Sequence, residues 1–236
     1  MNPATTPVPP EDVQGDGRWM SIHNRFVEET TLWEPEVLFI GDSLIRNLTY
    51  SDMWKEVFVP MHPLNFGIGG DQTQHVLWRV LNGELEHIKP KVVVLLVGTN
   101  NIGHSPEQIV EGIREVVKVI QSKQPQAYLV LIALLPRGQK PNPLRERNDK
   151  VNLLLKEQMT GLDRLQILDL NKGIVHAEGT IDAHDMDDYL HLTPQGYRKT
   201  FEPLHELLTQ LLSEGEVEEL EDDLSSGSAC APLKIE

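Results

Sequence analysis

Five short apolar runs alternate along the chain with longer stretches whose apolar residues recur at helical spacing. Each run is continuous rather than alternating with polar residues, which favours strands buried on both faces of a parallel sheet. The predicted strands cover 37–40, 64–66, 92–97, 128–135 and 165–170.

Three stretches outside the apolar runs carry helix-start signals. Ser105 is a predicted N-cap, Pro106 suits the first helical position, and Gln108 completes a capping box. Asn142-Pro143 and Thr193-Pro194 open two further predicted helices. Strand–helix alternation of this kind predicts an α/β fold with a parallel, doubly wound sheet.

The two ends of the chain differ in composition from its middle. Residues 1–15 are rich in Pro and Thr with nothing to bury, and we expect a flexible arm there. Residues 214–236 carry eight carboxylates and one lysine, about half of the net charge of -15. We therefore predict one domain over 16–212 and a disordered acidic tail over 213–236.

Charge and cysteine content narrow the functional classes. The net charge of -15 is opposite to that of a nucleic-acid binder and disfavours adsorption to anionic membranes. No apolar stretch reaches the ~18 residues that span a bilayer, so no stable membrane insertion is expected. Residues 1–13 lack the apolar run of a secretory signal, and the single cysteine, Cys230, excludes an internal disulfide. We expect a cytoplasmic protein.

Polar clusters follow the first three predicted strands, where sites of doubly wound folds lie. In Gly41-Asp42-Ser43-Leu44, Ser43 is a candidate nucleophile, and a plain helix N-cap is the alternative. In 67–71, the amide of Gly70 is a candidate oxyanion donor, and a glycine turn is the alternative. In 98–101, the side chain of Asn100 is a second candidate donor, against an Asn-rich turn.

A fourth cluster precedes the last predicted helix. Asp188 and His191 can touch across one helix-like turn, and the carboxylate would then orient the imidazole for proton transfer. The surrounding density of His184, Asp185 and Asp187 leaves a divalent metal site as a competitor, and a solvated acidic loop as another.

The order of these clusters carries more information than any one of them. Gly41-Asp42-Ser43-Leu44, Gly70, Asn100 and Asp188-x-x-His191 resemble the four sequence blocks of the SGNH (GDSL) hydrolases. Further segments at 18–21, 64–71, 75–79, 97–101, 135–138 and 184–186 are similar to the catalytic alpha subunits of intracellular platelet-activating factor acetylhydrolases. The similarity runs from about Asp12 to Leu212.

The resemblance implies a fold, an activity and an assembly. The fold would be a flavodoxin-like, three-layer α/β/α sandwich with a central parallel sheet. The reaction would be hydrolysis of the sn-2 acetyl ester of platelet-activating factor to the lyso lipid and acetate, with no metal and no organic cofactor. The alpha subunits would form a homo- or heterodimer and bind a WD-repeat, lissencephaly-type beta subunit linked to dynein.

The resemblance also implies roles for single residues. Ser43, Asp188 and His191 would be catalytic, and the Ser43 amide, Gly70 and Asn100 would form the oxyanion hole. Substrate-binding positions would be Leu44, Thr99 and Leu190, with ordinary core packing as the alternative for the two leucines. The region of Arg18, Trp19 and Arg25 would lie at the dimer contact, against a solvated surface.

Two other functions stay open from the sequence. The first is a general short-chain esterase, thioesterase or carbohydrate deacetylase of the same superfamily. The second is a scaffold that mainly binds the WD-repeat dynein regulator.

Overall fold

A parallel sheet forms the centre of the molecule. The computed structural model describes residues 1–226, with side chains as far as Glu214. Within this part, the strands pair in the order β2-β1-β3-β4-β5, and every pairing is parallel. Their bounds are β1 (Val37–Gly41), β2 (Pro63–Gly67), β3 (Val92–Leu96), β4 (Tyr128–Ile132) and β5 (Leu165–Leu168).

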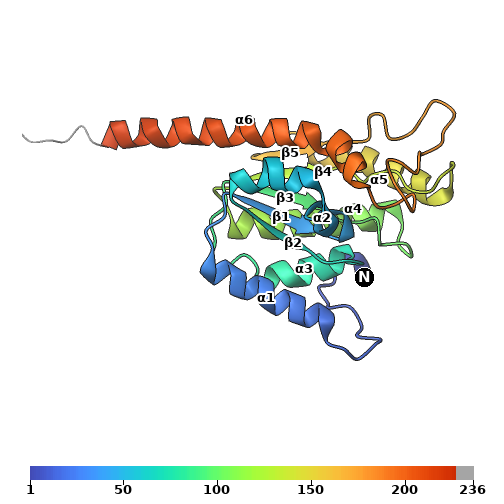
Figure 1. Cartoon of the computed structure of the whole chain (residues 1–236). Coiled ribbons are helices and arrows are strands. Elements are labelled where there is room, and N and C mark those ends of the chain that lie inside the picture. The colour runs from blue at the N-terminus through green and yellow to red at the C-terminus, as the bar shows by residue number, and fades with distance from the viewer. Residues whose placement is uncertain (227–236) are drawn as a thin grey trace, which may run out of the picture.

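Helices cover both faces of this sheet. Figure 1 shows α1 and α3 on one face and α6 along the other, which confirms the predicted three-layer α/β/α sandwich. The helices are α1 (Arg18–Leu32), α2 (Ser43–Leu48), α3 (Thr73–Leu81), α4 (Pro106–Lys123), α5 (Pro143–Met159) and α6 (Pro194–Ser226). Short helical segments are η1 (Pro3–Thr5), η2 (Trp54–Phe58) and η3 (Val59–Met61). None of the helices in the described residues is both long and apolar enough to cross a bilayer.

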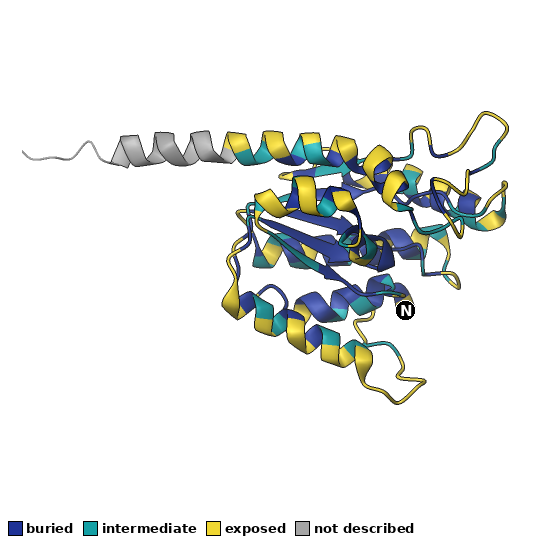
Figure 2. Ribbon diagram, in the orientation of Figure 1, coloured by how far each residue is buried: buried dark blue, intermediate teal, exposed yellow. Residues whose placement is uncertain are grey.

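The apolar runs form the core as predicted. Every residue of β1 and of β3 is buried, and Figure 2 shows the strands enclosed between half-exposed helices. Continuous burial on both faces is why these strands contain no alternating polar positions. From β1 the chain adds β2 on one side, whereas β3, β4 and β5 follow on the other side. The crevice between β1 and β3, where the order of addition changes side, is where doubly wound folds place their sites.

Local signals determine where two of the helices begin. The Ser105 side chain accepts a hydrogen bond from the Gln108 amide, and the Gln108 side chain accepts one from the Ser105 amide, as a capping box requires. The Asn142 side chain accepts from the amides of Leu144 and Arg145. These two predicted helix starts are therefore present in the structure, and α6 begins at Pro194, as Thr193-Pro194 predicted.

The start of the N-terminal arm is packed rather than free, which differs from the flexible arm expected over 1–15. Ala4 is fully buried, and its carbonyl oxygen accepts a hydrogen bond of 2.9 Å from the Thr73 hydroxyl. The Asn2 side chain caps η1 and donates to the carbonyl oxygen of Gln108. These partners lie about seventy and a hundred residues away, so no local composition signal could indicate them.

The C-terminal boundary also differs from the expected one. We predicted a disordered tail from residue 213, whereas α6 continues to Ser226. Five of the fourteen residues from 213 to 226 are glutamates, which are good helix formers and favour continuation of the helix. The rest of the predicted tail, 227–236, lies outside the described residues.

Candidate active site

Ser43 stands at the start of α2, immediately after the central strand β1. Asp42 is the N-cap of that helix, and one of its carboxylate oxygens accepts a hydrogen bond of 2.9 Å from the Leu44 amide. Ser43 is 7% exposed, and its hydroxyl oxygen lies 2.9 Å from Nε2 of His191. Asp42, and not Ser43, is therefore the helix N-cap. The Ser43 side chain instead contacts the imidazole of His191, which lies 148 residues further along the chain.

Asp188 completes a hydrogen-bonded chain with His191 and Ser43. Its Oδ2 lies 2.6 Å from Nδ1 of His191, and its Oδ1 accepts from the amides of Leu190 and His191. Tyr189, between them, adopts φ of 59°, and the segment turns so that the two side chains meet. The structure thus brings together the three residues predicted as nucleophile, base and orienting acid.

The charge of Asp188 determines which nitrogen of His191 carries the proton. Partial burial works to raise the pKa of Asp188, but the hydrogen bonds from the His191 and Leu190 amides and from the His191 ring hold that pKa below its ordinary value. An ionised Asp188 keeps the proton on Nδ1 of His191. Nε2 is then free to accept the proton of the Ser43 hydroxyl.

The glycine loop that follows β2 lies beside the turn that carries Ser43. The Ile68 amide donates to the carbonyl oxygen of Gly41, which joins this loop to the end of β1. Gly70 adopts φ of 83°, a left-handed conformation that a side chain would strain, and its amide has no acceptor among the described residues. The Asn100 side chain donates to the carbonyl oxygen of Asp71, the residue after Gly70, at 3.0 Å. The two predicted oxyanion donors are therefore neighbours.

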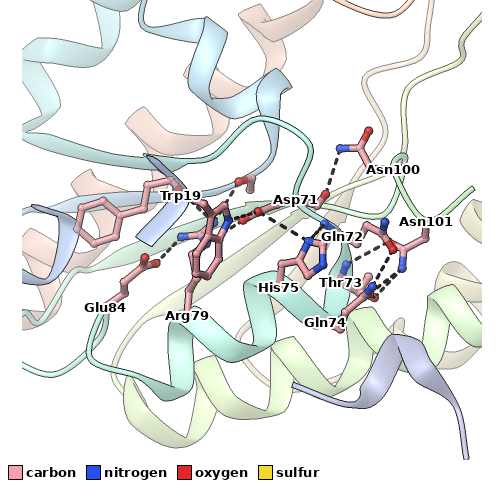
Figure 3. A network of polar contacts seen from close by, with 12 residues as sticks. Trp19, Asp71, Gln72, Thr73, Gln74, His75, Arg79, Glu84, Asn100 and Asn101 are labelled. Carbon is pink, nitrogen blue, oxygen red and sulfur yellow. Dashed lines mark hydrogen bonds and ion pairs between the residues drawn. The ribbon is translucent and has the colours of Figure 1, made fainter. Parts of the chain in front are cut away.

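A buried ionic network contacts the glycine loop that follows β2 (Figure 3). Arg79 is fully buried and forms ion pairs with Asp71 and with Glu84, while its Nη2 donates to the carbonyl oxygens of Gly41 and Phe66 at 3.2 and 3.1 Å. Burial alone would lower the pKa of Arg79, but the two carboxylates raise it, so the guanidinium stays charged.

Two side chains of α1 extend the same network. The Trp19 indole donates to Asp71 at 2.7 Å, and the His23 ring contacts Glu84 at 2.9 Å. Sequence reasoning missed this network, because its members lie on three separate segments and each is unremarkable alone.

The three residues that we expected at a dimer contact differ in exposure. Trp19 is half-buried and bonded within its own chain, whereas Arg18 and Arg25 are exposed.

The three predicted substrate-binding residues differ in their surroundings. Leu44 is 1% exposed and belongs to the hydrophobic core, so ordinary packing accounts for it in this structure. Thr99 is buried, and its carbonyl oxygen accepts hydrogen bonds from Arg137 and Arg147. Leu190 is half-buried beside His191. Arg137, which donates to Thr99, was indicated only by the motif at 135–138.

The acidic loop before α6 does not gather ligands for a metal ion. His184 pairs with Asp182, and His191 pairs with Asp188. Across the described residues, no three His, Cys, Asp or Glu side chains are grouped so that they could hold a cation.

A serine, an imidazole and a carboxylate in one hydrogen-bonded chain, at the strand ends of a parallel sheet, define the class of serine hydrolases. Comparison with known proteins then gives the family. The GDSL-like Lipase/Acylhydrolase family matches residues 39–199. The chain belongs to this family, in the group of platelet-activating factor acetylhydrolase IB alpha subunits.

Sequence relatives support that grouping. The chain is 56% identical to platelet-activating factor acetylhydrolase IB subunit alpha1 of Homo sapiens, over 90% of this chain and 92% of the relative. It is 55% identical to subunit alpha2 of Gallus gallus, over 90% of this chain and 93% of the relative.

Solved structures share the fold at low identity. A GDSL-like lipase of Bacteroides thetaiotaomicron superposes with a TM-score of 0.67 at 15% identity, over 82% of this chain and 98% of that one. Est24, a carbohydrate acetylesterase of Sinorhizobium meliloti, gives 0.57 at 14% identity, over 75% and 100%. At these identities the likeness concerns the fold alone.

Proposed function

We propose that the protein is a serine esterase that hydrolyses the sn-2 acetyl ester of platelet-activating factor to the lyso lipid and acetate. The observation that carries the chemistry is the hydrogen-bonded chain from Ser43 through His191 to Asp188. The substrate is supported by the 55–56% identity to subunits named platelet-activating factor acetylhydrolase. Residues 16–212 form the catalytic domain in this proposal.

Acylation begins at Ser43. Its hydroxyl oxygen attacks the acetyl carbonyl carbon while Nε2 of His191 takes the hydroxyl proton. The positive charge that develops on the imidazole is stabilised by the ionised Asp188. His191 then gives the proton to the glycerol oxygen as the ester bond breaks, which releases the lyso lipid and leaves an acetyl group on Ser43.

The tetrahedral intermediate needs donors for its oxyanion. The Ser43 amide at the start of α2, the Gly70 amide and the Asn100 side chain supply them in this proposal. Water then attacks the acetyl-enzyme, with His191 as its base, and the Ser43 hydroxyl is restored as acetate leaves. The substrate, one water molecule and the side chains named above supply every atom and proton of this reaction, so the proposed mechanism includes no cofactor.

Leu44 and Leu190 are proposed, by similarity to the family, to restrict the acyl group to short chains, and Thr99 is proposed as a further substrate-binding residue. Each is adjacent in sequence to a proposed catalytic or oxyanion residue, which supports the idea. The core position of Leu44 makes Leu190 the better test. In Leu190→Ala, activity on butyryl and longer esters should rise relative to acetyl esters, and an unchanged chain-length profile would reject the role.

An alpha-subunit dimer that binds a WD-repeat beta subunit in the cytoplasm is proposed on the family relationship. The exposed positions of Arg18 and Arg25 on α1 leave both available to a second subunit. Sedimentation of Arg25→Ala tests the dimer contact, and an unchanged dimer would remove the reason for placing it there. Pull-down of the WD-repeat protein by Ser43→Ala separates scaffolding from catalysis, because binding should survive loss of the nucleophile.

Acetate release from acetyl-labelled platelet-activating factor tests the whole proposal. The wild-type protein should turn over the lipid, an organophosphate that traps activated serines should stop the reaction, and Ser43→Ala should abolish it. A panel of neutral acetyl esters separates this function from a general short-chain esterase. Undiminished hydrolysis by Ser43→Ala would show that another group is the nucleophile.

A further inference from the structure

A cavity of about 460 Å³ lies next to the proposed oxyanion loop. One wall is formed by the segment 9–17 with the first turn of α1, and the other by Arg46, Ile68 and Gly69. Ser43, Asp188 and His191 do not line this cavity. The cavity instead adjoins the site through Gly69, which precedes Gly70, and through Arg46, which lies one helical turn after Ser43.

Arg46 presents a guanidinium at the wall formed by α2 and the glycine loop. Residues three apart on a helix share a face, so the side chains of Ser43 and Arg46 are neighbours on α2. A Cβ atom on Gly69 would lie 2.5 Å from Nη1 of Arg46, which means that the guanidinium rests directly on the backbone of the glycine loop. Only a residue without a side chain permits this contact.

The guanidinium is also available to a ligand. Its Nε donates to the side chain of Asn47 at 3.0 Å, but within the described residues no carboxylate pairs with it. In a chain with 36 acidic and 21 basic side chains, an unpaired arginine beside a reaction site is suited to an anionic group brought by the substrate.

The opposite wall carries three acidic residues and one arginine. Glu11, Asp12 and Asp16 line it together with Arg18, whose guanidinium pairs with Asp16 at 3.2 Å. The Asp12 carboxylate accepts from two backbone amides, and Trp19 contributes an indole ring that stacks on His23 on one side. The hydrogen bond from the Trp19 N–H to Asp71 holds that ring in place. Carboxylates together with an aromatic face suit a quaternary ammonium, which cannot donate hydrogen bonds and is held by electrostatic and cation–π attraction.

We propose that this cavity binds the phosphocholine headgroup of the acetyl phospholipid, with the phosphate on Arg46 and the trimethylammonium group against Trp19 and the acidic wall. The inference rests on the proposed function, because the ester must lie at Ser43. In such a lipid the phosphate is only a few bonds from the sn-2 ester. Arg46 lies three residues after Ser43 on α2 and against the residue that precedes Gly70, so in this proposal it receives the phosphate of a lipid whose ester lies at Ser43.

Kinetic specificity gives the first test. For wild type and Arg46→Gln, kcat/KM is measured on platelet-activating factor and on the neutral ester p-nitrophenyl acetate. The ratio of the two values should fall about ten- to a hundredfold in Arg46→Gln, as expected for loss of a hydrogen bond to a charged group, and mainly through KM on the lipid. Arg46→Lys should recover part of the ratio. Arg198→Gln, which removes an exposed arginine from α6, is the charge-matched control and should keep the ratio.

Direct binding separates this proposal from the proposed function. Phosphocholine is added to wild type, Arg46→Gln and Arg198→Gln, and saturation-transfer NMR detects its contact with the protein; inorganic phosphate and choline are run beside it. Contact with wild type and Arg198→Gln but not with Arg46→Gln supports the headgroup site, even if the lipid itself is not hydrolysed. Absence of contact with wild type, equal contact with Arg46→Gln, or a lipid-to-neutral ratio within twofold of wild type would overturn it.

Discussion

Replacing Asp42 by asparagine should remove a loss of folding stability that occurs in the wild-type protein as pH rises. The Asp42 carboxyl is 0% exposed, with one oxygen bonded to the Leu44 amide and the other buried without a partner in the described structure. Burial raises its pKa to about 7, the nearby Asp71 adds to this, and the Leu44 amide, Arg137 and Arg46 oppose it. The charged form is therefore the unfavourable one.

The sign of the effect follows from comparing the folded and unfolded chains. In the unfolded chain this carboxyl ionises near its ordinary pKa of 3.8, whereas the folded chain keeps the proton until about pH 7. The folded state then binds more protons between these values, so stability falls as pH rises through this window and levels off above it. At about 1.4 kcal/mol per unit, the full loss is about 4 kcal/mol.

Urea unfolding of wild type and Asp42→Asn at pH 5 and pH 8 measures this loss. Asparagine keeps the cap acceptor of α2 but cannot ionise, so the stability of the variant relative to wild type should rise by about 3 kcal/mol between the two pH values. Asp52→Asn, at an exposed carboxyl, should follow wild type at both. A difference between Asp42→Asn and wild type that does not change with pH would refute the reasoning, since no ionisation of Asp42 would then be linked to folding.

Three further changes test other parts of the structure. Asn100→Ala should lower kcat on acetyl esters by about 10²–10³, and a loss of less than threefold would remove Asn100 from the oxyanion hole. Arg79→Met leaves Asp71 and Glu84 buried without their cation and should lower the free energy of unfolding by about 3–5 kcal/mol in urea titration; a neutral effect would mean that water enters the network. Ser105→Ala should cost about 1 kcal/mol through loss of the α4 cap, measured as a lower Tm, and an unchanged Tm would show the cap to be dispensable.

The elements with local signals could be predicted from the sequence. The run 92–97 is apolar throughout because β3 is covered on both faces, so its pattern alone identifies a central strand. Ser105-Pro106 and Asn142-Pro143 satisfy free amides at helix starts within two or three residues of themselves. Such signals do not depend on the rest of the fold.

The elements that depend on distant partners could not be predicted. Helix α1 begins after Gly17 without a side-chain cap, and its buried residues His23, Phe26 and Thr30 are too few and too polar to mark an apolar face. Its role becomes visible only when Trp19 and His23 reach Asp71 and Glu84, 52 and 61 residues away. In the same way, the burial of Ala4 depends on helices far along the chain.

Within the candidate site, some features could be predicted from the sequence and others could not. Ser43, Asp188 and His191 were accessible to sequence reasoning because chemistry restricts which residue types can serve, and because the order of the motifs follows the order of strand ends. The surroundings of Leu44 were not accessible, since a leucine at a strand end can line a pocket or fill a core. The structure places its side chain in the core.

Arg79 explains why a charged network occupies the centre of this fold. Replacing a buried ion pair with apolar side chains often leaves stability unchanged or higher, so stability alone does not account for one. An apolar residue, however, could not donate to the carbonyl oxygens of Gly41 and Phe66, which end β1 and β2 just before Ser43 and the glycine loop. The guanidinium donates to both and also binds Asp71, which accepts the Asn100 side chain on its backbone oxygen. One buried residue thereby connects the strand end before Ser43 to the glycine loop and to the acceptor of the Asn100 side chain, which constrains the relative positions of the proposed nucleophile and the two proposed oxyanion donors.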